Sequence, residues 1–230
     1  MSDYFGKVIL GLLIVFCCLE AEAGSNGDTT RTEPSMPARF FVGWDVSRTL
    51  IQAVGSPQRL AAARLEYVGS RWSGAFDFGA GLHQKRFDLY EAQSIGSFAR
   101  IGLNRLLIRD QVSELGFGFG LGTSQYRYRA SGILLEGLPF DSPRVVQYSS
   151  SGMAVYWTDF SALMKARIWK AIWLGFELKL KLLISGDSNA IPSYFAPGYG
   201  IVQNRFLPGF NYYIFVAISG KPKRIVSTPH

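Results

Sequence analysis

The most regular alternation of apolar and polar residues in this chain runs from Ile172 to Ile184. Every second position is bulky and apolar: Ile172, Leu174, Phe176, Leu178, Leu180, Leu182 and Ile184. The positions between them include Glu177, Lys179 and Lys181. Because a strand points successive side chains to opposite faces, this pattern predicts a β-strand with one apolar face and one charged face.

The same period of two recurs along the chain and predicts eight strands. They cover residues 39–47, 60–68, 72–82, 97–107 and 113–128, the two halves of a hairpin at 154–184, and 209–219. The alternation is weaker in the second strand, where the run Ala61–Ala63 would equally suit the start of a short helix. Long connections alternate with short ones, and the long ones are 48–59, 83–96, 129–153 and 185–208.

Alternating loop lengths, an apolar strand face and an even number of strands are typical of bacterial outer-membrane barrels. A closed barrel pairs every strand edge, whereas each unsatisfied backbone group in hydrocarbon costs several kcal/mol. After Leu19, no segment is apolar for the roughly 18 residues that a membrane helix needs. We therefore predict an all-β fold: an eight-stranded antiparallel up-and-down transmembrane β-barrel after an N-terminal signal peptide, with both termini in the periplasm.

The first 23 residues have the composition of a secretory signal peptide. Val8–Leu19 is an apolar core too short to span a bilayer, and Ala21–Ala23 follows it as a cleavage site. A lipoprotein signal ending at Cys17 or Cys18 is the alternative, but bulky residues precede both cysteines. The predicted organisation is a signal peptide at 1–23, a disordered leader at 24–38, a barrel domain at 39–219 and a basic tail at 220–230. The predicted location is the bacterial outer membrane.

Cleavage of the signal peptide changes the charge of the chain. The full sequence has a formal net charge of +7, and the first 23 residues remove one lysine and three acids, so the mature charge is +9. In the envelope this charge favours outer-membrane lipids and lipopolysaccharide as partners, and we expect no nucleic acid. Both cysteines leave with the signal peptide and no cluster of metal ligands follows. We therefore expect neither a metal site nor a cofactor.

Charged residues recur on the strand faces opposite the apolar ones, so they should point into the barrel. The predicted polar network of the lumen contains Asp77, Arg100, Glu114, Asp159, Lys165, Arg167, Glu177 and Lys179. An eight-stranded barrel has an interior just wide enough for side chains to fill. We therefore expect these residues to form salt bridges that fill the lumen. A polar pathway or a ligand site is the alternative.

Two other features are candidates for chemistry. Gly116–Gly122 is glycine-rich, but it lacks the strand-to-helix context and the third glycine of a dinucleotide-binding loop. Its glycines are expected to face inward and make room for larger side chains. His83 is the only histidine before His230, and no spacing singles out a nucleophile beside it. The sequence therefore does not predict an enzyme or catalytic residues.

Three stretches together resemble a family of secreted small β-barrels with a domain of unknown function, mostly from Bacteroidota. They are Gly96–Gly102, the hairpin Tyr156–Gly175, and the pair Pro197–Gly200 with Gly209–Tyr213. The resemblance covers about residues 40–219. It implies an outer-membrane barrel without an assigned activity, so no catalytic or cofactor-binding residues can be carried over.

The predicted function is a structural or surface-interaction role in the outer membrane. The long outer loops 129–153 and 185–208 are the expected contact surfaces for an extracellular or envelope partner. One alternative is a secreted soluble barrel that binds an apolar ligand, with its apolar face turned inward. The other is an outer-membrane enzyme that modifies lipids, with His83 and the acids of the lumen as candidates.

Overall fold

The computed structural model describes residues 37–47, 58–87, 90–134, 144–186 and 195–218. Its secondary-structure elements are all strands, and in this described part no helix is long and apolar enough to cross a membrane. The predicted signal peptide at 1–23, nearly all of the leader at 24–38 and the basic tail at 220–230 lie outside the described residues. These three segments therefore stay predictions.

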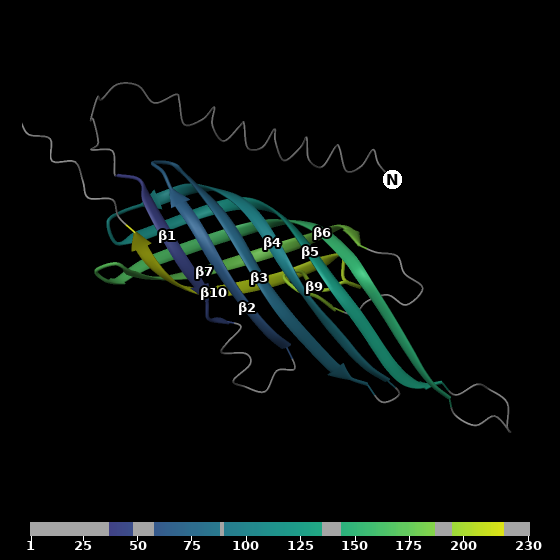
Figure 1. The fold of residues 1–230 in the computed structure, drawn as a ribbon. Helices are drawn as coiled ribbons and strands as arrows, with labels where there is room; N and C mark the ends of the chain where they lie inside the picture. Colours follow the sequence, from purple (N-terminus) through teal and green to yellow (C-terminus); the bar gives the residue numbers. More distant parts are fainter. Residues whose placement is uncertain (1–36, 48–57, 88–89, 135–143, 187–194, 219–230) are drawn as a thin grey trace, which may run out of the picture. The chain divides into compact units, whose positions relative to one another are not determined.

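Eight strands form one antiparallel sheet that closes into a ring (Figure 1), in the order β1-β10-β7-β6-β5-β4-β3-β2. Their bounds are β1 Arg39–Asp45, β2 Gln58–Val68, β3 Trp72–Arg86, β4 Tyr90–Arg109, β5 Ser113–Leu134, β6 Arg144–Trp169, β7 Ile172–Gly186 and β10 Phe206–Ile218. Two further short strands, β8 Phe195–Ala196 and β9 Gly200–Ile201, pair with each other. The prediction of an all-β fold with eight antiparallel strands in a closed sheet is confirmed.

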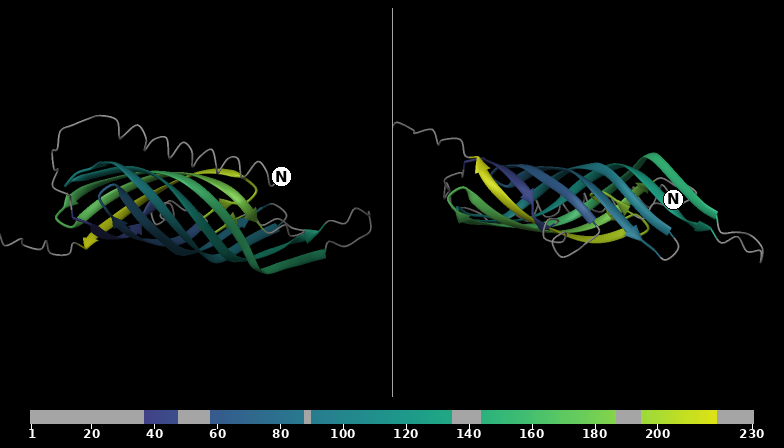
Figure 2. Two further views of the ribbon diagram at one scale, coloured as in Figure 1. Left: turned by 90° about the horizontal axis from the view of Figure 1, so that it is seen from above. Right: turned by 60° about the horizontal axis from the view of Figure 1, so that its bottom comes forward.

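Four strands extend far into segments that were predicted as loops. β3 and β4 continue through the predicted loop 83–96 and stay paired up to Arg86 and Glu91. β5 and β6 occupy most of the predicted loop 129–153 and stay paired beyond Arg129 and Ser149. Figure 2 shows this teal-to-green hairpin reaching past the other strands. The prediction of loops was wrong because it relied on apolar alternation, whereas ladder hydrogen bonds to a neighbouring strand hold polar residues in a strand equally well.

The two faces of the sheet differ in the way that the sequence predicts. Outward side chains such as Phe40, Ile101 and Leu178 are exposed by 57%, 59% and 51%. Their inward neighbours are buried, as Phe41 and Glu177 illustrate. The second strand, whose pattern is weak, follows the same rule. It pairs with β3 from Gln58 to Val68 and with β1 from Ala63 to Val68, so the run Ala61–Ala63 belongs to a strand and not to a helix.

The interior has three layers along the strands. One end holds an apolar cluster that includes Phe41, Val68, Leu106, Trp173 and Phe215. The other end, where β5 and β6 extend, holds a second apolar cluster that includes Tyr126, Met153, Val155, Trp157 and Tyr199. On β7 the order from Trp173 through Glu177 and Lys179 to Leu183 shows that buried charges lie between these two clusters. The charges of Glu177 and Lys179 thus lie between two apolar layers.

Glycines on the inner face of β5 make room for large side chains, as predicted for Gly116–Gly122. Arg100 lies against Gly120, and the indole of Trp157 lies directly over Gly122. A Cβ atom at either glycine would overlap the side chain beside it. The small inward residues of β5 therefore allow an arginine and a tryptophan to fill the same narrow interior.

We expect Gly122→Val to destabilise the protein by about 1–3 kcal/mol, because overpacking forces Trp157 or the backbone to move. Urea unfolding of the protein in detergent micelles, followed by tryptophan fluorescence, measures this change. The matched control is Gly74→Val on β3, where an added Cβ meets no atom within 4 Å. Equal stability of the two variants would contradict the close packing at Gly122.

Candidate functional site: the charged interior

Three neighbouring strands bring alternating charges into one row inside the barrel. The register pairs Arg64 on β2 with Asp77 on β3, and Asp77 with Arg100 on β4. Directly opposed residues in an antiparallel pair have Cβ atoms about 4.5–5.5 Å apart, so long side chains meet easily. Each charge in this row therefore has an opposite charge on the adjacent strand.

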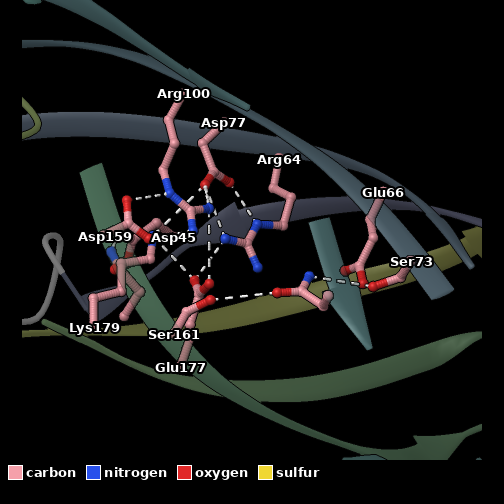
Figure 3. A network of polar contacts seen from close by, with 12 residues as sticks. Asp45, Arg64, Glu66, Ser73, Asp77, Arg100, Asp159, Ser161, Glu177 and Lys179 are labelled. Carbon is pink, nitrogen blue, oxygen red and sulfur yellow. Dashed lines mark hydrogen bonds and ion pairs between the residues drawn. The ribbon is translucent and has the colours of Figure 1, made fainter. Parts of the chain in front are cut away.

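The two arginines and their carboxylates form a compact network (Figure 3). The Arg64 guanidinium donates to Asp77 through Nε at 2.5 Å and Nη2 at 2.8 Å, and to Glu177 through Nη2 at 2.5 Å. Arg100 donates from Nη1 to Asp77 at 2.7 Å. It donates two more hydrogen bonds to Asp159, from Nε at 2.7 Å and from Nη2 at 2.5 Å. Both arginines thus bridge carboxylates from different strands, which crosslinks the barrel through its centre.

Lys179 completes this central network. Its Nζ atom lies 3.0 Å from Glu177 and 3.6 Å from Asp77. The network then consists of three cations, Arg64, Arg100 and Lys179, and three carboxylates, Asp77, Asp159 and Glu177. Its charges balance, which is the condition under which ions can be buried away from water without a large penalty.

A second ionic cluster lies nearer the end with the short turns. Lys165 Nζ is 3.0 Å from Glu66 and 2.6 Å from Glu114, and Arg39 is 3.6 Å from Glu114. The same ammonium lies 4.3 Å from the centre of the Phe41 ring. Two cations again face two carboxylates, and the aromatic ring adds a favourable contact with the lysine.

The structure buries seven of the eight residues predicted for the lumen network. Those seven are Asp77, Arg100, Glu114, Asp159, Lys165, Glu177 and Lys179. The prediction for Arg167 was wrong, because its side chain is exposed at the end of β6. The register between β6 and β7 shifts between Arg167 and Trp169, so the strand leaves the regular barrel wall there. A period of two points a side chain inward only while the wall continues.

Arg39 on β1, which pairs with Glu114, was not among the residues predicted for the network. Two further members were missed from the sequence, Arg64 and Glu66. Both lie on the inner face of β2, in the series Leu60, Ala62, Arg64, Glu66 and Val68. That series begins and ends with apolar residues, and the outward series begins with Arg59. Neither face of β2 is therefore uniformly polar, which obscured the inward direction. One signal could have found them. Arg64 and Glu66 are charged residues two positions apart, and the neighbouring strand also points a charged residue, Asp77, inward.

The central network leaves very little space. The cavity beside it, lined by Asp77, Arg100, Lys179 and Tyr213 among others, measures about 20 Å³. A volume of this size holds about one water molecule. The geometry therefore favours a filled lumen over the alternative of a polar pathway or a ligand site.

Part of the predicted surface loop 185–208 folds into the barrel instead. Phe195, Ala196 and Tyr199 are buried, and Tyr199 packs on Trp157 with ring centroids 5.8 Å apart. Because residues 195–205 close the end where β5 and β6 extend, we call them the plug segment. An apolar segment that finds an apolar cluster inside the barrel is more stable there than exposed to water.

Hydrogen bonds fix the backbone of the plug segment. Lys181 Nζ donates to the carbonyl of Gly198 at 2.5 Å and to that of Tyr199 at 3.0 Å. Ser94 Oγ donates to the Phe195 carbonyl at 2.7 Å. Burial raises the pKa of the Tyr199 phenol, which therefore stays protonated and donates to the carbonyls of residues 204 and 205. Gly198 has a φ of 79° and lies against Phe98, so this position requires glycine.

We expect Lys181→Met to loosen the plug segment while the barrel stays folded. The variant removes the donor for two buried carbonyls, which costs about 1–3 kcal/mol per unsatisfied group. Limited proteolysis in detergent should then cleave the variant within residues 195–205, whereas the unchanged protein resists. Arg71→Met, an exposed cation in the β2–β3 turn, is the control. Resistance equal to that of the control would contradict the role of Lys181.

His83 takes part in packing near the plug segment. Its ring stacks on Phe195 with centroids 4.5 Å apart and 23° between the planes. Within the described residues, no group of three or more His, Cys, Asp or Glu side chains is placed to hold a metal ion. Most of the residues that the sequence offers as functional candidates therefore lie in the ionic clusters around Arg64 and Lys165.

The comparison with protein families finds a family whose model covers nearly the whole chain. The model of the domain of unknown function DUF6048 matches residues 1–219. The chain belongs to this family. The match ends one residue after β10 ends and includes the plug segment with its Pro197–Gly200 stretch. No curated protein matches the chain. Membership of DUF6048 brings no activity with it, so a function has to be argued from the geometry.

Proposed function

We propose that this chain is an outer-membrane β-barrel with a filled lumen, which serves as a structural element and contact surface of the bacterial envelope. A cleaved signal peptide at 1–23 would direct it there, and the family would be one of envelope barrels, mostly of Bacteroidota. It acts without a cofactor and without catalysis.

The observation that carries this proposal is the inverted polarity of the sheet. In the part of the chain that the structure describes, thirty large apolar side chains are exposed, among them Phe40, Ile101, Phe117, Leu178 and Phe210, which come from five different strands. The opposite face holds the buried ions. A soluble monomer rarely exposes a contiguous apolar surface of more than a few hundred Å². In a membrane, the hydrocarbon of the lipids would surround these apolar side chains, and the arrangement would then be stable.

The alternative of a soluble barrel with an apolar ligand inside requires the opposite orientation. Leu174, Phe176 and Leu178 would have to line the interior, but Glu177 and Lys179 do so. The enzyme alternative would draw on His83 and the acids of the lumen. His83 stacks on Phe195, and the acids Asp77, Asp159 and Glu114 are paired with Arg64, Arg100 and Lys165. The geometry therefore favours the non-catalytic membrane barrel.

The contact surface is the extension of β3, β4, β5 and β6. Its outward residues are polar: Gln84, Glu91, Gln93, Arg129, Ser131, Gln147 and Ser149 line one cleft of about 510 Å³. Residues 129–149 of this surface belong to the predicted contact loop 129–153, whereas residues 84–93 come from the segment 83–96, which was predicted only as a connecting loop. In a membrane this polar extension stands beyond the apolar band, where an extracellular or envelope partner reaches it.

Fractionation and heat-modifiable migration test the proposal. The protein expressed with its signal peptide should sediment with outer membranes, and unboiled samples should migrate faster on SDS gels than boiled ones. An environment-sensitive fluorophore on a cysteine at Leu178 should report hydrocarbon, and one at Gln147 should report water. Recovery of the whole protein in the soluble periplasmic fraction would refute a membrane location.

A further inference from the structure

An apolar groove on the outer surface of β1–β4 ends at an arginine. Small residues form its floor, including Ala61, Ala80 and Gly81, and bulky Trp44 and Ile95 flank it. The groove has a volume of about 500 Å³. Small side chains between large ones leave a furrow on a surface that hydrocarbon would otherwise cover evenly. An acyl chain fits such a furrow in size and polarity.

Two arginines mark the boundary between this apolar groove and the polar extension. The register places Arg59, Leu82, Ile95 and Arg127 in one row across β2, β3, β4 and β5. Both arginines are exposed, and no ion pair among the described residues uses them. Three strand spacings of about 4.8 Å separate their Cα atoms by about 14 Å. Two unpaired cations at the edge of an apolar band form a site for anionic groups of a lipid.

The next rows beyond the arginines carry hydrogen-bonding groups. Gln84, Gln93, Arg129 and Ser149 follow in register across β3–β6 and line the polar cleft. Gln84 and Gln93 lie two residues from Leu82 and Ile95, so the cleft and the apolar groove meet on the same face. Glu91 is the one carboxylate in the cleft; it accepts a hydrogen bond from Gln84 and pairs in register with Arg86.

We infer that this face binds a phosphorylated glycolipid of the outer leaflet. The acyl chain occupies the groove over Ala61 and Ala80, phosphate groups contact Arg59 and Arg127, and sugar hydroxyls contact the amides of Gln84 and Gln93. These adjoining apolar, cationic and polar surfaces match a lipid whose sugars carry both acyl chains and phosphate groups. A phospholipid without sugars would leave the polar cleft unused. The inference rests on the proposed membrane location.

The test uses the mature full-length protein in detergent micelles titrated with three lipids. They are bisphosphorylated lipid A, its dephosphorylated form and phosphatidylglycerol, and the shift of the thermal unfolding midpoint gives each apparent affinity. We expect lipid A to bind most tightly. The double variant Arg59→Gln/Arg127→Gln should weaken it about tenfold or more, because charge-assisted hydrogen bonds are lost. Arg71→Gln, at the other end of the barrel, should leave it unchanged.

A second pair of variants tests the groove. Ala80→Phe fills the furrow and should lower the affinity for lipid A, whereas Ala166→Phe on β6 adds the same ring away from the groove and should not. Equal affinity for lipid A and phosphatidylglycerol, or equal effects of the double variant and Arg71→Gln, would overturn the glycolipid site. Flotation with phosphatidylcholine vesicles tests insertion separately, so a protein that inserts without lipid preference overturns this inference alone.

Discussion

Replacing Arg64 by alanine is expected to destabilise the barrel by about 3–5 kcal/mol, as removal of one partner from a buried ion pair does. The Arg64 side chain is fully buried and holds both Asp77 and Glu177. Without it, the two cations Arg100 and Lys179 would face three carboxylates in an interior that leaves space for about one water molecule. The guanidinium also lies 4.4 Å from the centre of the Tyr213 ring, a contact that alanine cannot make. Urea unfolding in micelles, with tryptophan fluorescence as the signal, measures the loss.

Two variants establish that the cause is unbalanced charge. Arg71→Ala removes an exposed arginine from the β2–β3 turn and should change stability by no more than about 0.5 kcal/mol. Arg64→Met combined with Asp77→Asn removes one charge of each sign and should recover part of the stability. A loss for Arg64→Ala no larger than that for Arg71→Ala would show that the central network contributes little.

Lys165→Met should cost about 3 kcal/mol in the same measurement, because it leaves Glu66 and Glu114 buried beside each other. Methionine keeps the aliphatic stem that packs near Phe41 and Phe215, so the loss reports mainly the missing charge. This cluster is separate from the one around Arg64, and the two effects should therefore be nearly additive.

The control for Lys165 lies on the same strand. Arg167→Met changes an exposed cation two residues further along β6 and should be almost neutral. Adding Glu66→Gln to Lys165→Met restores the charge balance with Arg39 and Glu114 and should recover stability. If the double variant were less stable than Lys165→Met alone, like-charge repulsion would not be the cause of the loss.

The outline of the fold could be predicted because alternation acts locally. Leu178 and Lys179 must point to opposite faces of any strand, whatever pairs with that strand. The ends of the strands could not be predicted in this way. Residues 83–86 are polar and residues 129–134 show no regular alternation, so only the neighbouring strands that complete their hydrogen bonds make them part of the sheet.

The sequence predicted most of the residues of the candidate site, but not which of them form ion pairs with each other. Asp77, Arg100 and Glu177 were expected in the lumen because the residues on either side of each in the sequence are apolar and belong to the other face of the strand. That Arg64 joins Asp77 to Glu177 depends on a contact between residues 113 positions apart. Such a contact follows from closure of the sheet, which brings β2 and β7 to face each other across the interior. No local pattern in β2 encodes it.

The sequence by itself therefore determined which side chains share a face of each strand, because the period of two is a property of each strand alone. The tertiary structure decided which charges meet, how far β3–β6 extend, and that residues 195–205 enter the barrel. Those outcomes depend on register and closure. Both are set by many pairs of residues that lie far apart in the sequence. The apolar strand faces could therefore be predicted from the sequence, whereas the balanced networks around Arg64 and Lys165 could be found only in the closed barrel.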